Sequence, residues 1–195
     1  MKRNITLDQM FKICSKPKSR KESHVGYCHI LEKSVHVIDY VLKKNSKVIF
    51  NRFDLSFPQN GFFTNDNNLF VKYIETLTKY YDKHNLEQKY FWIRSTSQSD
   101  SRQIYHLFLL CKEHNTTISY NIFEMASKLW MKLLETDITG LVNYSLSDNG
   151  IMIDRNSSDY MDAIEKCIFI VSYFAKIRCK GFCPSGIRDF GSSRV

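Results

Sequence analysis

The hydrophobic positions along the chain repeat with two different periods, and these separate predicted helices from predicted strands. A spacing of three and four residues is typical of a helix with one buried face. Alternating or continuous apolar runs, rich in aromatic and β-branched residues, are typical of strands. The predicted helices are His29–Lys44, Asn65 or Asp66 to near Asp82–Asn85, Tyr120–Leu134 and Asp159–Arg178, and the longer predicted strands are Lys47–Phe57, Lys89–Ser95 and Gln103–Cys111.

The segments between these elements predict how the strands pair. A polar loop joins Lys89–Ser95 to Gln103–Cys111, which favours a hairpin. Short strands at Leu141–Leu146 and Gly150–Ile153 flank an Asn-Gly turn and predict a second hairpin. The strand at Lys47–Phe57 changes phase near its middle, around Asn51 and Arg52, which predicts a bulge. The order of elements predicts an α+β fold with a central antiparallel sheet and helices packed on it.

Length and composition indicate one globular unit. The chain has 195 residues, of which 43% are hydrophobic, enough for one domain with a substantial core. We predict a basic N-terminal arm over residues 1–27 and a single domain over residues 28–195. The arm would either follow a phosphate backbone or only increase solubility.

The charge of the chain favours a polyanionic partner. Lys and Arg number 28 against 20 Asp and Glu, for a formal charge of +8, and clustered basic residues gain affinity for nucleic acid by releasing counterions. No apolar run approaches the ~20 residues that span a bilayer, and the first residues are too polar for a signal peptide. We therefore expect a soluble protein inside the cell, without a membrane partner. The oligomeric state stays open.

Two sequence features argue against other classes of site. Neither a GxxxxGK[ST] loop nor a GxGxxG loop is present, so nucleoside-triphosphate chemistry is disfavoured. The six cysteines mostly lie in apolar patterns and are expected to be reduced thiols. Cys179 and Cys183 would bind zinc only if two more ligands came from elsewhere, such as Cys14, Cys28 or His29.

The helix predicted at Asp159–Arg178 carries the first candidate for chemistry. Its buried face is predicted to hold Ile164, Ile168 and Phe174, whereas Tyr173 and Lys176 fall on the polar side. Residues three apart share a helix face, and a neighbouring ammonium group stabilises the phenolate form of a tyrosine. Tyr173 is thus a candidate nucleophile. The alternative is a surface tyrosine beside a lysine that has no chemical role.

The predicted strands carry the second candidate. His106 is the one histidine of Gln103–Cys111, and imidazole is the side-chain type that can change its charge near neutral pH. Arg52 and Asp54 are two residues apart on the strand Lys47–Phe57 and should share one face. The alternative for His106 is a half-buried histidine with a local hydrogen-bond partner.

Several short motifs together suggest a family. The chain resembles the phage and prophage replication initiators of the inovirus type, the YagK/YfjJ C-terminal domain family, from about Ile30 to its C-terminus. The motifs that carry the resemblance are RFDLSFP at Arg52–Pro58, WIRS at Trp92–Ser95, YHLFLL at Tyr105–Leu110, YFAK at Tyr173–Lys176 and DFGSSR at Asp189–Arg194.

The resemblance implies a rolling-circle initiator related to the HUH endonucleases, with a ferredoxin-like sheet. It implies that Tyr173 attacks a phosphodiester to leave a 5′-phosphotyrosyl link, with Lys176 as its electrostatic partner. His106 would correspond to the second histidine of a pair that holds Mg²⁺ or Mn²⁺ against the scissile phosphate, with Asp54 nearby.

Two departures from the family pattern affect the implied metal site. Ile104 occupies the position of the first histidine of the pair, and Ser95 occupies the position after Trp-x-Arg where an acidic residue is often found. A hard cation prefers several oxygen donors, so either Asp54, Gln103 or His114 replaces the lost ligands, or the nuclease has decayed.

We therefore expect a replication initiator of a phage or mobile element that acts on single-stranded or melted origin DNA in the bacterial cytoplasm and nicks it through Tyr173. The alternatives are a catalytically inactive origin- or operator-binding protein and a protein-interaction domain. The basic residues expected to contact DNA are Arg52, Arg94, Lys166, Arg178, Lys180, Arg188 and Arg194.

Overall fold

The computed structural model describes residues 24–59, 65–84, 87–97, 102–112, 117–144, 150–178 and 185–195. Its helices are α2 (His24–Lys44), α3 (Asn68–Lys83), α4 (Thr117–Leu133) and α5 (Tyr160–Arg178). Its strands are β1 (Lys47–Ser56), β2 (Gln88–Thr96), β3 (Gln103–Lys112), β4 (Val142–Asn143), β5 (Ile151–Asp154) and β6 (Phe190–Ser192).

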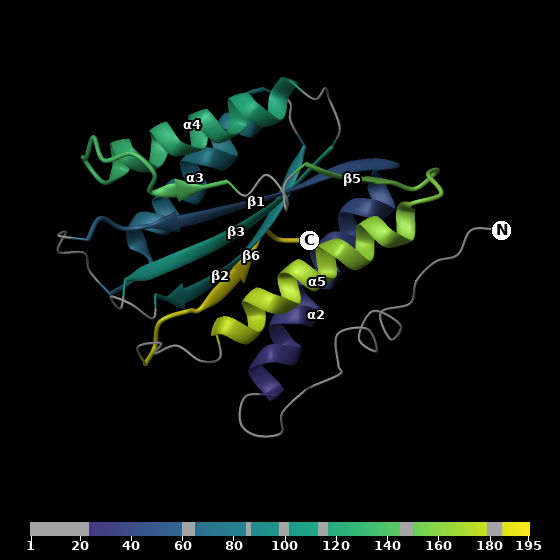
Figure 1. The fold of residues 1–195 in the computed structure, drawn as a ribbon, viewed down its shortest axis with the longest axis horizontal. Coiled ribbons are helices and arrows are strands. Elements are labelled where there is room, and N and C mark those ends of the chain that lie inside the picture. The colour runs from purple at the N-terminus through teal and green to yellow at the C-terminus, as the bar shows by residue number, and fades with distance from the viewer. Residues whose placement is uncertain are drawn as a thin grey trace.

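Within these ranges the strands form one six-stranded antiparallel sheet, in the order β4-β1-β3-β2-β6, with β5 also pairing β1. Helices α2 and α5 cover one face of the sheet, and α3 and α4 cover the other (Figure 1). The α+β prediction with an antiparallel sheet and packed helices is confirmed. No helix in the described ranges is long and apolar enough to cross a membrane.

Because helices cover both faces, each central strand contributes to two separate cores. In β1, Val48 and Phe50 pack beneath α2 and α5, whereas Phe53 and Leu55 pack beneath α3 and α4. Successive side chains of a strand point to opposite faces, so this division needs no change in the backbone.

The bulge predicted in β1 is wrong. Pairing between β1 and β3 is continuous from Val48–Lys112 to Ser56–Ile104. The apolar pattern changes phase because the buried apolar residues of β1 change face along the strand. Val48 and Phe50 point toward α2 and α5, and on this face Arg52 and Asp54 follow them. The apolar residues Phe53 and Leu55 point to the opposite face.

The predicted hairpin between β4 and β5 is also wrong. Both strands pair with β1, β4 opposite Asp54 and Leu55 and β5 opposite Lys47–Phe50. Between these stretches the side-chain oxygen of Asn51 accepts hydrogen bonds from Gly150 N (3.1 Å) and Tyr144 Oη (3.4 Å). The hairpin of β2 and β3 is confirmed.

The structure also differs from the sequence prediction at the two ends of the chain. Helix α2 begins at His24 rather than His29, within the segment 1–27 predicted as an arm. Near the C-terminus, β6 pairs with β2 and opposes Gly191 to Trp92. The sequence pattern of this short segment, which contains a glycine, does not predict a strand.

Gly191 allows β6 to lie close to β2. A Cβ at this position would stand 2.8 Å from the Trp92 indole, closer than unstrained packing permits. We expect Gly191→Ala to lower the free energy of unfolding by about 1–3 kcal/mol, because the indole must shift. Urea denaturation measures the change, and Ser192→Ala, at an exposed position of the same strand, is the matched control. Equal stability of the two variants would contradict the close packing.

Candidate functional site

A row of polar side chains lies on the sheet face beneath α5. Arg52 and Asp54 continue the row of Val48 and Phe50 along β1, as their spacing predicts. Asp54 stands directly opposite His106 of β3, and Ser95 of β2 is the next polar residue on this face. Residues from three adjacent strands therefore form one cluster, in which Arg52, Ser95 and His106 are buried.

Hydrogen bonds connect the side chains of this cluster in series. His106 Nδ1 lies 2.8 Å from Asp54 Oδ1, and His106 Nε2 lies 2.8 Å from Ser95 Oγ. Arg52 donates to Asp54 Oδ2 at 2.9 Å. A carboxylate only accepts hydrogen bonds, so Nδ1–H of His106 donates to Asp54. The second ring nitrogen, Nε2, shares a hydrogen bond with the Ser95 hydroxyl. Both nitrogens of His106 are thus engaged.

Phe174 of α5 covers this series of hydrogen-bonded side chains. Its ring centroid lies 4.3 Å from that of His106, and the Arg52 guanidinium carbon lies 4.4 Å from the Phe174 centroid. A cation over an aromatic face is attracted by the ring quadrupole. The polar row therefore helps to fix α5 on the sheet.

The cluster has the connectivity of a nucleophile, a base and an orienting carboxylate, since Ser95, His106 and Asp54 bond in that order. The Ser95 side chain is nevertheless buried beneath α5. The His106 ring is also buried and contacts Phe174. The arrangement fits the alternative prediction for His106, a histidine with local hydrogen-bond partners.

Two of the three predicted metal ligands come together, and the third does not. His106 and Asp54 are adjacent, but Gln103 lies on the opposite face of the sheet, where its Nε2 donates to Asn65 Oδ1 at 2.7 Å. Across the described ranges, no group of three His, Cys, Asp or Glu residues is arranged to hold a metal ion. The donors present therefore fit Mg²⁺ or Mn²⁺ poorly, because these ions prefer several oxygen ligands. His114 lies outside the described residues.

Arg94, predicted to contact DNA, is buried on the same face as Gln103. Its Nη2 donates to the main-chain oxygen of Asn65 at 3.0 Å and to its side-chain oxygen at 3.1 Å. These bonds hold the segment that leads into α3. Arg52 is likewise buried, so the structure places two of the predicted DNA contacts in internal roles.

The candidate nucleophile lies on the outer face of α5. Tyr173 is 55% exposed and Phe169, one turn earlier, is 70% exposed, whereas Ile164, Ile168 and Phe174 are buried as predicted. Lys166 and Lys176 are exposed on the same stripe of the helix. Tyr173 thus lies on the solvent side of the helix, while the adjacent Phe174 covers His106.

The remaining predicted residues are scattered. Arg188 and Arg194 are exposed on the segments flanking β6. Arg178 ends α5, and its side chain is outside the described part of the structure. Also outside it are Lys180 and the cysteine side chains named for zinc, Cys14, Cys28, Cys179 and Cys183. His29, named with them, is exposed and contacts Phe190.

A second pair of tyrosine and lysine, Tyr40 and Lys44 of α2, is not among the site residues that the sequence predicts. Lys44 Nζ donates to Tyr40 Oη at 2.5 Å. This hydrogen bond, together with the positive charge of Lys44, lowers the pKa of Tyr40. The four-residue spacing on a predicted helix was the available signal, and it is the same kind of signal that selected Tyr173 and Lys176.

Comparison with known proteins gives one match. The model of the YagK/YfjJ C-terminal domain family matches residues 6–193, nearly the whole chain. No curated protein and no solved structure matches.

Removal of the Asp54 carboxylate tests the role of the buried row. We expect Asp54→Ala to lower the free energy of unfolding by about 3–5 kcal/mol, because the buried Arg52 and His106 would both lose the carboxylate that they bond. Urea denaturation measures this, with Asp137→Ala at an exposed position as control. If both variants were equally stable, the row would not fix α5.

Proposed function

The chain belongs to the YagK/YfjJ C-terminal domain family, and we propose that it binds single-stranded or melted DNA at the replication origin of a phage or mobile element. In this proposal binding is the function, and the outer face of α5 is the contact surface. The replication role is inferred from the resemblance of the motifs to the family, and the mode of binding is inferred from the residues on the outer face of α5.

The observation that carries the proposal is the stripe formed by Lys166, Phe169, Tyr173 and Lys176, called here the α5 stripe. Its two aromatic rings are largely exposed, although exposure of large apolar side chains to water is unfavourable. Single-stranded nucleic acids present unpaired bases, which stack on such rings without a sequence requirement. The lysines lie one turn outside the aromatic pair, where they would meet the phosphates.

Net charge supports the same partner. The formal charge of +8 gives long-range attraction to a polyanion. Arg188 and Arg194 add exposed cations beyond the α5 stripe. Since phosphate contacts release counterions, we expect binding to weaken as salt rises.

A second candidate function is the nicking reaction expected from the resemblance. The exposure of Tyr173 favours it, because a nucleophile must reach the phosphate. In this reaction the phenolate oxygen of Tyr173 attacks phosphorus, a phosphotyrosyl ester forms, and the bond to the 3′ oxygen breaks to leave a 3′-hydroxyl. We rank this second because Phe174 and hydrogen bonds occupy His106.

We expect Phe169→Ala to weaken binding of a labelled single-stranded oligonucleotide by about 1–3 kcal/mol, the value of one base–aromatic stack. Fluorescence anisotropy at low and moderate salt measures the affinity. The control is Tyr80→Ala, which removes an exposed aromatic ring from α3 on the other side of the sheet. Equal effects of the two variants, or none, would contradict binding at the α5 stripe.

Nicking is tested separately with Tyr173→Phe, which keeps the ring and removes the hydroxyl. Wild-type protein and labelled oligonucleotides that tile the element's origin are incubated with Mn²⁺ or Mg²⁺ and resolved on a denaturing gel. If Tyr173 is the nucleophile, we expect a protein–DNA adduct that Tyr173→Phe abolishes and Tyr80→Phe retains. Retention of DNA on a native gel without any adduct would limit the function to binding.

A further inference from the structure

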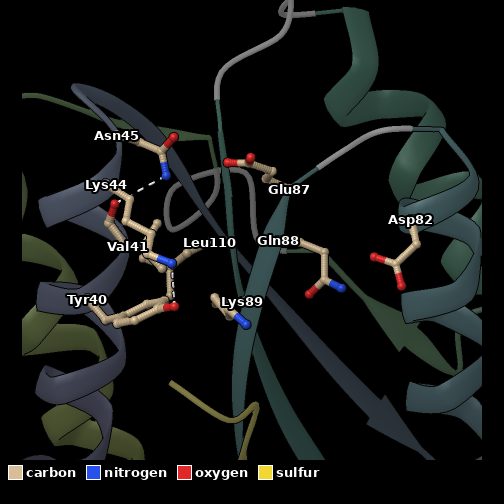
Figure 2. Close-up of a pocket in the computed structure, with 9 residues that line it drawn as sticks. All are labelled: Tyr40, Val41, Lys44, Asn45, Asp82, Glu87, Gln88, Lys89 and Leu110. Carbon is tan, nitrogen blue, oxygen red and sulfur yellow. Dashed lines mark hydrogen bonds between the residues drawn. The ribbon is translucent and has the colours of Figure 1, made fainter.

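A cavity of about 260 Å³ opens between the C-terminal end of α2, the start of β2 and the end of α3. It shares no residue with the α5 stripe or with the polar row beneath α5. In Figure 2, Tyr40, Lys44 and Asn45 lie on one side, Asp82 lies on the other, and Gln88 and Lys89 lie between them. The walls therefore bring cationic groups and hydrogen-bond acceptors into one space.

One half of the cavity is suited to an anion. The amine of Lys44 lies 4.4 Å from the Tyr40 ring centroid, and the amine of Lys89 lies 5.7 Å from it. Because Tyr40 Oη accepts a hydrogen bond from Lys44, its own proton remains available to a ligand. Lys89 also donates to the Arg194 main-chain oxygen at 3.0 Å, which holds its side chain near the cavity. Charge-assisted hydrogen bonds of this kind are strong.

The other half of the cavity carries hydrogen-bond acceptors. Gln88 Oε1 is buried and accepts no hydrogen bond from the described part of the chain. A buried acceptor left without a partner is unfavourable. Asp82 and Glu87 also line the cavity, with Asp82 beyond Gln88 and Glu87 toward Asn45 (Figure 2). This half would be satisfied by a ligand that donates hydrogen bonds through amino, imino or hydroxyl groups.

We propose that the cavity binds one phosphate-bearing nucleotide, with the phosphate on Lys44, Lys89 and Tyr40 and the donors of the nucleoside on Gln88 and the carboxylates. The nucleotide is either a free monophosphate or the 5′-phosphorylated end of a DNA strand, since both present the same groups. The proposal does not depend on binding at the α5 stripe.

The test is isothermal titration of the full chain with the four 2′-deoxynucleoside 5′-monophosphates, the unphosphorylated nucleosides and inorganic phosphate. We expect saturable binding of at least one monophosphate, weakened about tenfold or more by Lys44→Gln through loss of a charge-assisted contact. Lys43→Gln is the matched control, because Lys43 is exposed on the same helix and pairs with Asp39. Tyr40→Phe, which keeps the ring, should also weaken binding.

Several results would overturn the proposal. These are absence of saturable binding, equal weakening by Lys43→Gln and Lys44→Gln, and inorganic phosphate binding as tightly as any monophosphate. Gln88→Leu should lower affinity for the monophosphate but not for phosphate; an unchanged affinity for the monophosphate would contradict the assigned orientation. Oligonucleotides with and without a 5′-phosphate distinguish a strand end from a free nucleotide. Phe169→Ala should leave binding of monophosphates unchanged, which separates this site from the α5 stripe.

Discussion

The antiparallel pairing of β1 with β3 is the constraint on which the rest of the structure depends. It runs without interruption along almost the whole of both strands, and β5, β4 and β2 are all added to this pair. Because helices cover both faces, each strand residue is committed to one of two cores. A slip of one residue would exchange the two sets of side chains. If β1 slipped, Arg52 and Asp54 would lie beneath α3 and α4, and Asp54 would no longer face His106 of β3.

The polar row beneath α5 follows from this register. A buried arginine is tolerated only with a partner, and Asp54 supplies it at 2.9 Å while also bonding His106. The helix above contributes an aromatic ring to both the histidine and the arginine. Once Phe174 is held there, the 3.6-residue period of the helix turns Phe169 and Tyr173 toward solvent. The buried row and the exposed α5 stripe are two consequences of the same docking.

This relation bears on function. A tyrosine nuclease of the expected kind needs its nucleophile and its metal ligands to meet at one phosphate. Here the helix separates them, with His106 beneath it and Tyr173 on its outer side. Ser95, found where an acidic residue was expected, bonds to the nitrogen of His106 that would otherwise be available. The residue types at positions 95 and 104 and the geometry of α5 are the reasons for ranking the proposed DNA binding above nicking.

The sequence by itself determined the helices, the three long strands and the exposed side of α5, because these depend on local periodicity. It also identified Asp54 and His106 as candidate site residues. Only the tertiary structure decided that β4 and β5 both join β1, that the C-terminal segment adds a strand, and that Gln103 faces away from His106. These outcomes depend on which strands become neighbours and on which face each residue lies, and no local pattern records that. The four-residue spacing of Tyr40 and Lys44 was a signal in the sequence for one wall of the cavity. The other walls come from residues distant in sequence, which only the packing of the fold brings together.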